Sequence, residues 1–159
     1  MNEYDEALSY ALRAGKYFDI NGPQNDFTEI LIHKAIEKYI QNCREQAPSD
    51  EQEQYKKIVD IAIENSIAKA DYKCPLGIAI DTQDVSLFKR VSELMNIHKL
   101  VESILPQLLS IDISFRKVIL DIIVSKLCLT DKYTASQYIN ILQVLYAKGD
   151  YENASRMVY

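Results

Sequence analysis

Apolar residues recur at intervals of three and four along almost the whole chain, and this spacing restricts the fold more than any other feature of the sequence. The clearest stripe consists of Tyr55, Ile58, Val59, Ala62, Ile63 and Ile67. An all-β fold needs many tight turns rich in glycine and proline, whereas the 159 residues include only 4 of each. The sequence therefore predicts an all-α protein of about eight to nine helices.

The centre of the chain, Ala70–Val91, has the pattern of two short helices joined by a polar turn. Small residues dominate the segment Cys74–Ile80, in which Pro75 is tolerable only in the first helical turn. The turn at residues 81–84 follows, and Asp84 is the expected N-cap of the second helix. We expect these two helices to form a hairpin.

A short phrase occurs three times in the chain: an aromatic residue, two spacers, and then a small or helix-starting residue. It begins at Tyr4, Tyr72 and Tyr151. The offsets of 68 and 79 residues between these positions each correspond to about two helix pairs of ~34–40 residues. This recurrence predicts stacked antiparallel helix pairs, an α-solenoid or helical-repeat rod, in a single domain over residues 1–159.

Caps and breakers set the expected helix boundaries. A first helix is expected near residues 4–12, and later starts are expected at Asp26, at Asn96, and at Thr130 or Asp131. The polar segment Arg44–Gln54 is predicted to be a loop, Pro106 to kink or end its helix, and Gly149 to terminate another. The core-facing stripe of the helix that starts at Asp26 should be Ile32, Ala35, Ile36, Tyr39, Ile40 and Cys43.

The segment 110–130 is apolar on two faces, which is typical of a helix packed between neighbours, with Ile122 at its centre. Its longest apolar run is too short and too often charged to span a bilayer. The net charge of −5 disfavours binding to nucleic acid or to an anionic membrane. The acidic start of the chain has the wrong sign for a signal peptide, so we expect a soluble intracellular protein.

Residues for acid–base, nucleophilic or metal chemistry are scarce and scattered. The only histidines, His33 and His98, have no ligand at metal-binding spacing, and the expectation for both is an ordinary surface or boundary position. Cys43, Cys74 and Cys128 form no CxxC pair and are expected to be reduced, buried thiols. We predict no catalytic, cofactor-binding or metal-binding residue and no small-molecule substrate.

Two further features have simple explanations. The doublets Lys56-Lys57 and Arg116-Lys117 fit solvated helix faces better than phosphate sites. The 11 tyrosines fit the rims of helix faces, where the ring packs and the hydroxyl stays in water. The functional alternative is that some tyrosines form a protein-binding surface.

Two segments carry a resemblance to a known family. They are ALSYALRAGKYFDIN at residues 7–21 and LGIAIDTQDVSLFKR at residues 76–90. Together they resemble the N-terminal helical region of the large non-ATPase scaffold subunits of the proteasome regulatory particle. The resemblance covers most of Tyr4–Leu145, although residues 114–145 follow it in pattern more than in identity, and Arg44–Gln54 departs from it.

The resemblance implies a non-catalytic scaffold that helps to hold the lid and base of the regulatory particle together in ubiquitin-dependent protein degradation. It implies other regulatory-particle subunits as partners, a cytoplasmic and nuclear location, and no catalytic residue, because the family has no active-site motif. It also implies that the chain is a piece of a much larger subunit, without that subunit's toroid repeats and C-terminal tail.

Two other readings remain open. The first is a tetratricopeptide-like adaptor that binds a peptide or partner helix in its groove, which lysine, arginine and asparagine lining successive helices would favour. The unequal offsets between the repeated phrases argue against it. The second is an all-helical enzyme, which would need a pocket of convergent titratable groups.

Overall fold

The computed structural model describes Tyr10 and residues 26–45, 52–127 and 133–158. Apart from Tyr10, these residues form eight α-helices and one 3₁₀ helix, with no strand among them. The helices are α2 (Asp26–Glu45), α3 (Gln52–Ala68), α4 (Lys73–Asp81), α5 (Val85–Leu94), α6 (Ile97–Ile104), η2 (Leu105–Gln107), α7 (Ile113–Lys126), α8 (Ala135–Lys148) and α9 (Tyr151–Val158). The prediction of an all-α helical-repeat fold is confirmed.

The chain divides into two compact units, Met1–Thr82 and Gln83–Tyr159, and each is described by itself. The boundary falls in the turn between α4 and α5. Both of these helices form where the sequence placed them. Their pairing as a hairpin and the single domain over residues 1–159 stay predictions.

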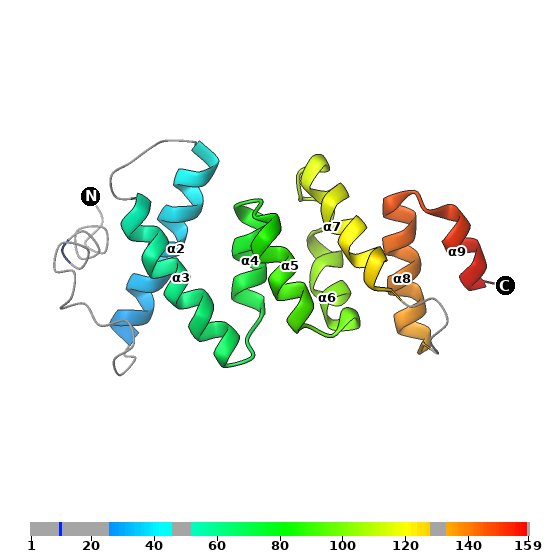
Figure 1. The fold of residues 1–159 in the computed structure, drawn as a ribbon, viewed down its shortest axis with the longest axis horizontal. Helices are drawn as coiled ribbons and strands as arrows, with labels where there is room; N and C mark the ends of the chain where they lie inside the picture. Colours follow the sequence, from blue (N-terminus) through cyan, green and yellow to red (C-terminus); the bar gives the residue numbers. More distant parts are fainter. Residues whose placement is uncertain (1–9, 11–25, 46–51, 128–132, 159) are drawn as a thin grey trace. The chain divides into compact units, whose positions relative to one another are not determined.

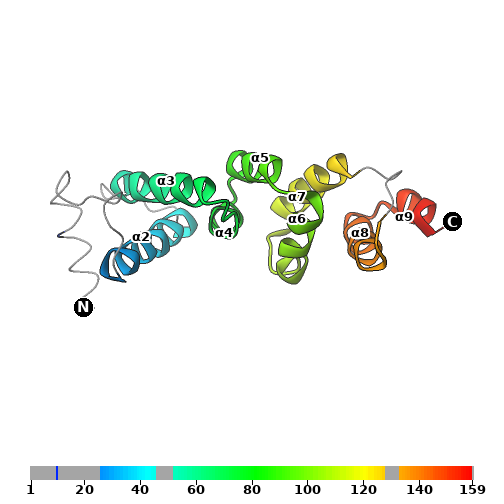
Figure 2. The ribbon, with the colours of Figure 1, turned by 90° about the horizontal axis from the view of Figure 1, so that it is seen from below.

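In the first unit, α2 and α3 lie side by side (Figures 1 and 2), and α4 packs against both. The predicted stripe of α3 is buried from Tyr55 to Ile63, with Ile67 half-buried at its end. Tyr55 and Ile58 pack against Leu31 and Ala35 of α2 to form the core of this unit. Helices α2 and α3 are therefore stabilised because each covers an apolar face of the other and excludes water from it.

The stripe predicted for α2 is partly wrong. Leu31, which it omitted, is among the most buried residues of the unit, and Ala35 is buried as predicted. The other five members, Ile32, Ile36, Tyr39, Ile40 and Cys43, are only half-buried. Because α2 is packed from more than one direction, its core contact is centred to one side of the stripe that spacing alone suggests.

The predicted loop Arg44–Gln54 is too long at both edges. Helix α2 continues through Arg44 to Glu45, and α3 already begins at Gln52, while residues 46–51 lie outside the described part. Polarity does not end a helix, since arginine, glutamate and glutamine have high helix propensities. Pro75 lies in the first turn of α4, as predicted.

In the second unit, the predicted caps of α5 and α6 are both confirmed. The Asp84 carboxylate accepts hydrogen bonds from the backbone N–H groups of Ser86 and Leu87, at 2.9 and 3.0 Å. The Asn96 side chain accepts one from the His98 N–H at 2.9 Å. Each cap satisfies backbone donors that have no partner within the helix. The open question at Pro106 is also answered: α6 ends at Ile104, and Pro106 lies within η2.

Helix α7 packs against α5, α6 and α8, which confirms the prediction of a helix between neighbours. Its buried residues are Phe115, Ile119, Leu120 and Ile123. The Phe115 ring meets Phe88 of α5 edge-to-face, with the ring centres 6.5 Å apart. Ile122, expected at the centre, is only half-buried. Apolar residues on two faces predict that a helix packs between neighbours, but they do not predict how deeply each residue at the border between the two faces is buried.

Helix α8 begins later than predicted. Its N-cap is Thr134, whose hydroxyl accepts from the Gln137 N–H while the Gln137 side chain accepts from the Thr134 N–H. The caps proposed at Thr130 or Asp131 lie outside the described residues. Gly149 ends α8 with φ of +82°, as its left-handed conformation requires. Ile141 and Leu145 of α8 then pack against Ala154 of α9.

Some expectations fall on residues that the structure does not describe, namely the first helix near residues 4–12, Tyr4 and Cys128. Within the described ranges, none of the helices combines the length and apolar character needed to cross a membrane.

Candidate functional site: a groove along α2

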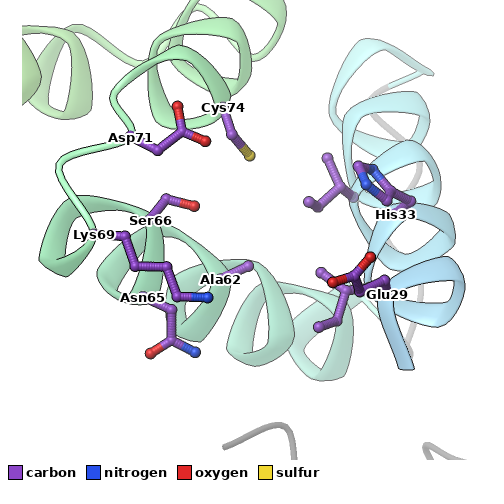
Figure 3. Close-up of a pocket in the computed structure, with 10 residues that line it drawn as sticks. Glu29, His33, Ala62, Asn65, Ser66, Lys69, Asp71 and Cys74 are labelled. Atoms are coloured by element: carbon purple, nitrogen blue, oxygen red, sulfur yellow. The ribbon is translucent and has the colours of Figure 1, made fainter. Parts of the chain in front are cut away.

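A hollow of about 280 Å³ opens between α2, α3 and α4 in the first unit (Figure 3). The residues that line it are Glu29, Ile32, His33, Ile36, Ala62, Asn65, Ser66, Lys69, Asp71 and Cys74. Three of them, Ile32, Ile36 and Ala62, supply an apolar floor, and most of the others are polar. The hollow therefore combines an apolar base with a hydrogen-bonding rim.

Each wall of this hollow comes from a different part of the unit. Figure 3 shows Glu29 and His33 on the side of α2 and Cys74 and Asp71 on the opposite side, at the start of α4. The Asp71 carboxylate accepts a hydrogen bond from the Lys73 N–H at 3.2 Å, which fixes it at the beginning of α4. Glu29 is thus carried by α2, whereas Asp71 lies in the connection before α4 and is anchored to the first residue of that helix.

A second hollow, of about 410 Å³, lies further along α2, and Glu37, Ile40, Gln41, Arg44, Glu45 and Asp81 line it. The Arg44 guanidinium donates to the Asp81 carboxylate at 2.5 Å and so links the ends of α2 and α4. Ile36 lines the first hollow and Glu37 the second, so the two are adjacent along the helix. We call the two hollows together the α2 groove.

Carboxylates outnumber cations in both hollows. The first has Glu29 and Asp71 against Lys69, and the second has three carboxylates against Arg44. One of those three, Glu37, also pairs with Lys34 at 2.6 Å, outside the lining. The α2 groove is therefore negative as a whole.

Cys74 supplies a thiol to the lining of the first hollow, from the first turn of α4. Burial raises the pKa of the Cys74 thiol, the hydrogen bond with Ser66 opposes this, and the negative charge of Asp71 adds to the increase. The thiol therefore stays protonated at neutral pH and is a poor nucleophile. His33, on the opposite side in Figure 3, is exposed.

Nucleophilic catalysis needs an activated nucleophile, a base within hydrogen-bond reach of it and a group that orients the base. No such set is found around Cys74 in the part of the chain that the structure describes. Nor do the described residues hold a group of three or more histidine, cysteine or acidic side chains placed to bind a metal ion. An apolar floor with a charged rim is what a polypeptide segment needs for docking.

The other residues considered from the sequence lie apart from the α2 groove. His98 is half-buried in the first turn of α6, and its ring meets Tyr133 edge-to-face at 5.3 Å. Cys43 and Cys74 are free thiols, but both are only half-buried, so the prediction that they are buried is wrong. Cys43 lies on α2 outside the lining. The doublets Lys56-Lys57 and Arg116-Lys117 lie on α3 and α7, and of the four side chains only Arg116 is half-buried.

Two tyrosines are exposed together in the second unit. Tyr146 of α8 and Tyr151 of α9 are 64% and 62% exposed, and their rings meet edge-to-face with centres 5.5 Å apart. Tyr55, by contrast, is buried in the core of the first unit. The tyrosines therefore divide between core packing and exposed aromatic surface, and a role of the exposed ones in protein binding stays a prediction.

Sequence reasoning missed the α2 groove, although one signal for it was present. Ala62, Asn65, Ser66 and Lys69 lie at positions i, i+3, i+4 and i+7 along the end of α3 and the residue after it, and all line the first hollow. They form a mostly polar stripe beside the apolar stripe that faces α2. A second, mostly polar stripe on a helix indicates a face that borders solvent. It does not indicate which residues of α2 and α4 lie across the hollow from it.

The family of the chain follows from comparison with known proteins. The model of the family described as "26S proteasome subunit RPN2, N-terminal domain" matches residues 1–159. A regulatory subunit RPN2 of the 26S proteasome from Saccharomyces cerevisiae is 35% identical over 89 residues, which is 51% of this chain. The 26S proteasome non-ATPase regulatory subunit 1 of Drosophila melanogaster is 33% identical over 96 residues, or 56% of this chain.

The aligned region is only 9% of the length of each of these two relatives. The family model nevertheless matches the chain from its first residue to its last, and the resemblance stated from the sequence is confirmed. The chain belongs to the family of N-terminal domains of the 26S proteasome subunit RPN2.

Proposed function

We propose that this chain is a non-catalytic scaffold segment of the proteasome regulatory particle, which presents a stiff helical surface to neighbouring lid and base subunits. The observation that carries the proposal is the family match over residues 1–159, because the matching relatives are named as regulatory subunits of the 26S proteasome. The segment would act in ubiquitin-dependent protein degradation, in the cytoplasm and nucleus.

The structure supports the proposal through its packing. Each unit buries an apolar core between helices, which makes it stiff. Several large apolar side chains remain exposed on the second unit, among them Leu109, Ile113 and Val158. Such side chains, with the exposed pair Tyr146 and Tyr151, are suited to contacts between subunits.

The alternative, an adaptor that binds a peptide or partner helix in a groove, draws support from the α2 groove. Asn65 and Lys69 of α3 and Arg44 of α2 line it, which is the kind of lining that this alternative expects. The two functions are compatible, because a scaffold can hold one of its neighbours through a groove.

Affinity purification tests the proposed function. The full-length subunit that contains this chain is tagged at its C-terminus and purified from its source. It should recover both lid and base subunits of the regulatory particle, which mass spectrometry identifies. A tagged subunit from which residues 1–159 are deleted is the comparison, and it should recover fewer lid or base subunits. Equal recovery of every subunit with and without this segment would contradict a scaffold role for it.

A further inference from the structure

We propose that the α2 groove holds a basic amphipathic helix from another protein subunit, with cationic side chains about two helical turns apart entering the two hollows. This inference rests on the proposed function and names the kind of neighbour that the first unit would contact. Its basis is the shape and charge of the groove, whose lining residues all belong to the first unit.

Each hollow has the chemistry to receive a lysine or arginine side chain. In the first, the half-buried side chains of Ile32 and Ile36 line the same hollow as the carboxylates of Glu29 and Asp71. An arginine or lysine has an aliphatic stem that packs on apolar residues and a charged head that needs an anion or water. The hollow supplies both along the length of one such side chain.

The second hollow repeats this combination. Ile40 is half-buried there, and Glu37, Glu45 and Asp81 supply the carboxylates. Asp81 is already paired with Arg44, and Glu37 with Lys34, while the Glu45 carboxylate accepts a hydrogen bond from the neutral Gln41 amide at 2.8 Å. Glu45 is therefore the carboxylate best placed to pair with an incoming cation.

The spacing of the hollows selects a helical occupant. The residues of α2 that line the first hollow are centred near position 32 and those of the second near position 41. At 1.5 Å per residue, the centres are separated by about 13.5 Å along the axis of α2. Side chains at positions i and i+7 of a second helix project from one face about 10.5 Å apart, and long lysine or arginine side chains reach over the remaining distance of about 3 Å. Apolar residues at i+3 and i+4 would then lie over Ile36, where the hollows meet.

An anionic partner fits the groove less well. A phosphopeptide, an acidic tail or a nucleic acid would bring further negative charge to a rim that already has an excess of carboxylates. The net charge of −5 of the chain acts in the same direction at longer range. Charge complementarity thus favours a basic segment.

The probe for the test is a fluorescein-labelled, capped alanine- and glutamine-based helical peptide with arginine at two positions seven residues apart and leucines between them on the same face. A second peptide has the same composition but places the arginines nine residues apart, so that they project from opposite faces. Fluorescence anisotropy at low salt should show saturable binding of the first peptide to the chain. Binding of the second should be at least about tenfold weaker.

Two double variants, matched in charge, locate the binding. Glu29→Lys with Glu45→Lys reverses charge in each hollow, and Glu93→Lys with Glu102→Lys makes the same change at exposed positions of the second unit. The first pair should lower the affinity for the peptide by at least about tenfold, and the second by less than about threefold. Circular dichroism monitors folding, and Glu29→Gln with Glu45→Gln provides a milder form if charge reversal unfolds α2.

The proposal is overturned if the first peptide fails to bind, if both peptides bind equally, or if the two double variants weaken binding equally. These outcomes leave the proposed function untouched, because that is decided by recovery of lid and base subunits with and without residues 1–159. Conversely, if the tagged subunit recovers equal amounts of lid and base subunits with and without residues 1–159 while the peptide still binds the chain, the proposed function is contradicted and the groove proposal stands.

Discussion

Truncation of Leu100 to alanine tests whether the packing of the second unit stabilises the chain as described. Leu100 lies on α6 with 0% of its surface exposed. The change removes three carbon atoms, which corresponds to roughly 2.4 kcal/mol of transfer free energy. The cavity left behind adds to this, so Leu100→Ala should lower the free energy of unfolding by about 3 kcal/mol, within a range of about 2–5. That is a large part of the roughly 5–15 kcal/mol that holds a typical domain folded.

Leu109→Ala is the matched control, because it makes the same chemical change at a side chain that is 89% exposed in the turn after η2. It should change the free energy of unfolding by no more than about 0.5 kcal/mol. Urea unfolding at 25 °C, followed by circular dichroism at 222 nm and by tyrosine fluorescence, measures both variants. A loss below about 1 kcal/mol for Leu100→Ala, or equal losses for the two variants, would refute the packing of α6.

Three smaller predictions concern helix ends. Asp84→Ala removes the acceptor for two backbone N–H groups and should cost about 1 kcal/mol in urea unfolding, most of which Asp84→Asn should restore; an unchanged stability would show that the cap is not formed. Gly149→Ala should cost about 1 kcal/mol from backbone strain alone, since no atom lies within 4 Å of the added Cβ, and a stabilised variant would contradict the left-handed conformation of Gly149. The hydrogen bonds from the Asn153 side chain and then its backbone N–H lower the pKa of the Asp150 carboxyl below its ordinary 3.8, so this stabilising contribution is present at neutral pH and is lost as the pH falls through the lowered pKa. An NMR titration should show that Asn153→Ala raises the Asp150 pKa, and an unchanged midpoint would exclude this cause.

Local signals in the sequence were sufficient where one residue decides the outcome. Asp84 and Asn96 cap α5 and α6, and Gly149 ends α8, because a short polar side chain or a glycine at a helix end acts on neighbouring backbone groups. The stripe on α3 was also predicted correctly, because five of its six members are buried and Ile67 is half-buried at the end of the helix.

The errors arose where several elements compete. Leu31 is buried and Ile122 is not, because the packing of α2 and α7 against more than one neighbour decides which border positions are covered. Helix α8 begins at Ala135 because two reciprocal hydrogen bonds between Thr134 and Gln137 cap it there, a pairing that was not considered from the sequence. The predicted loop was too long because polar residues such as Arg44 and Gln52 form helix readily.

The α2 groove lay beyond sequence reasoning for a related reason. Its walls come from α2, from α3 and from α4 with the turn before it. Glu29 and Asp71 are brought to one rim only when α4 folds back against α2. The mostly polar stripe of α3 indicated a wet face, but the opposing carboxylates are 42 positions apart in the chain.

Cross-linking of assembled regulatory particles, with the cross-linked peptides identified by mass spectrometry, tests most directly whether this segment acts through contacts with its neighbours. Exposed lysines on both units, Lys56 and Lys57 on α3 and Lys99 and Lys117 on α6 and α7, serve as attachment points. The account predicts cross-links from these lysines to lid or base subunits. If lysines of residues 1–159 cross-link only within their own subunit, while other parts of that subunit reach its neighbours, the scaffold role of this segment is contradicted.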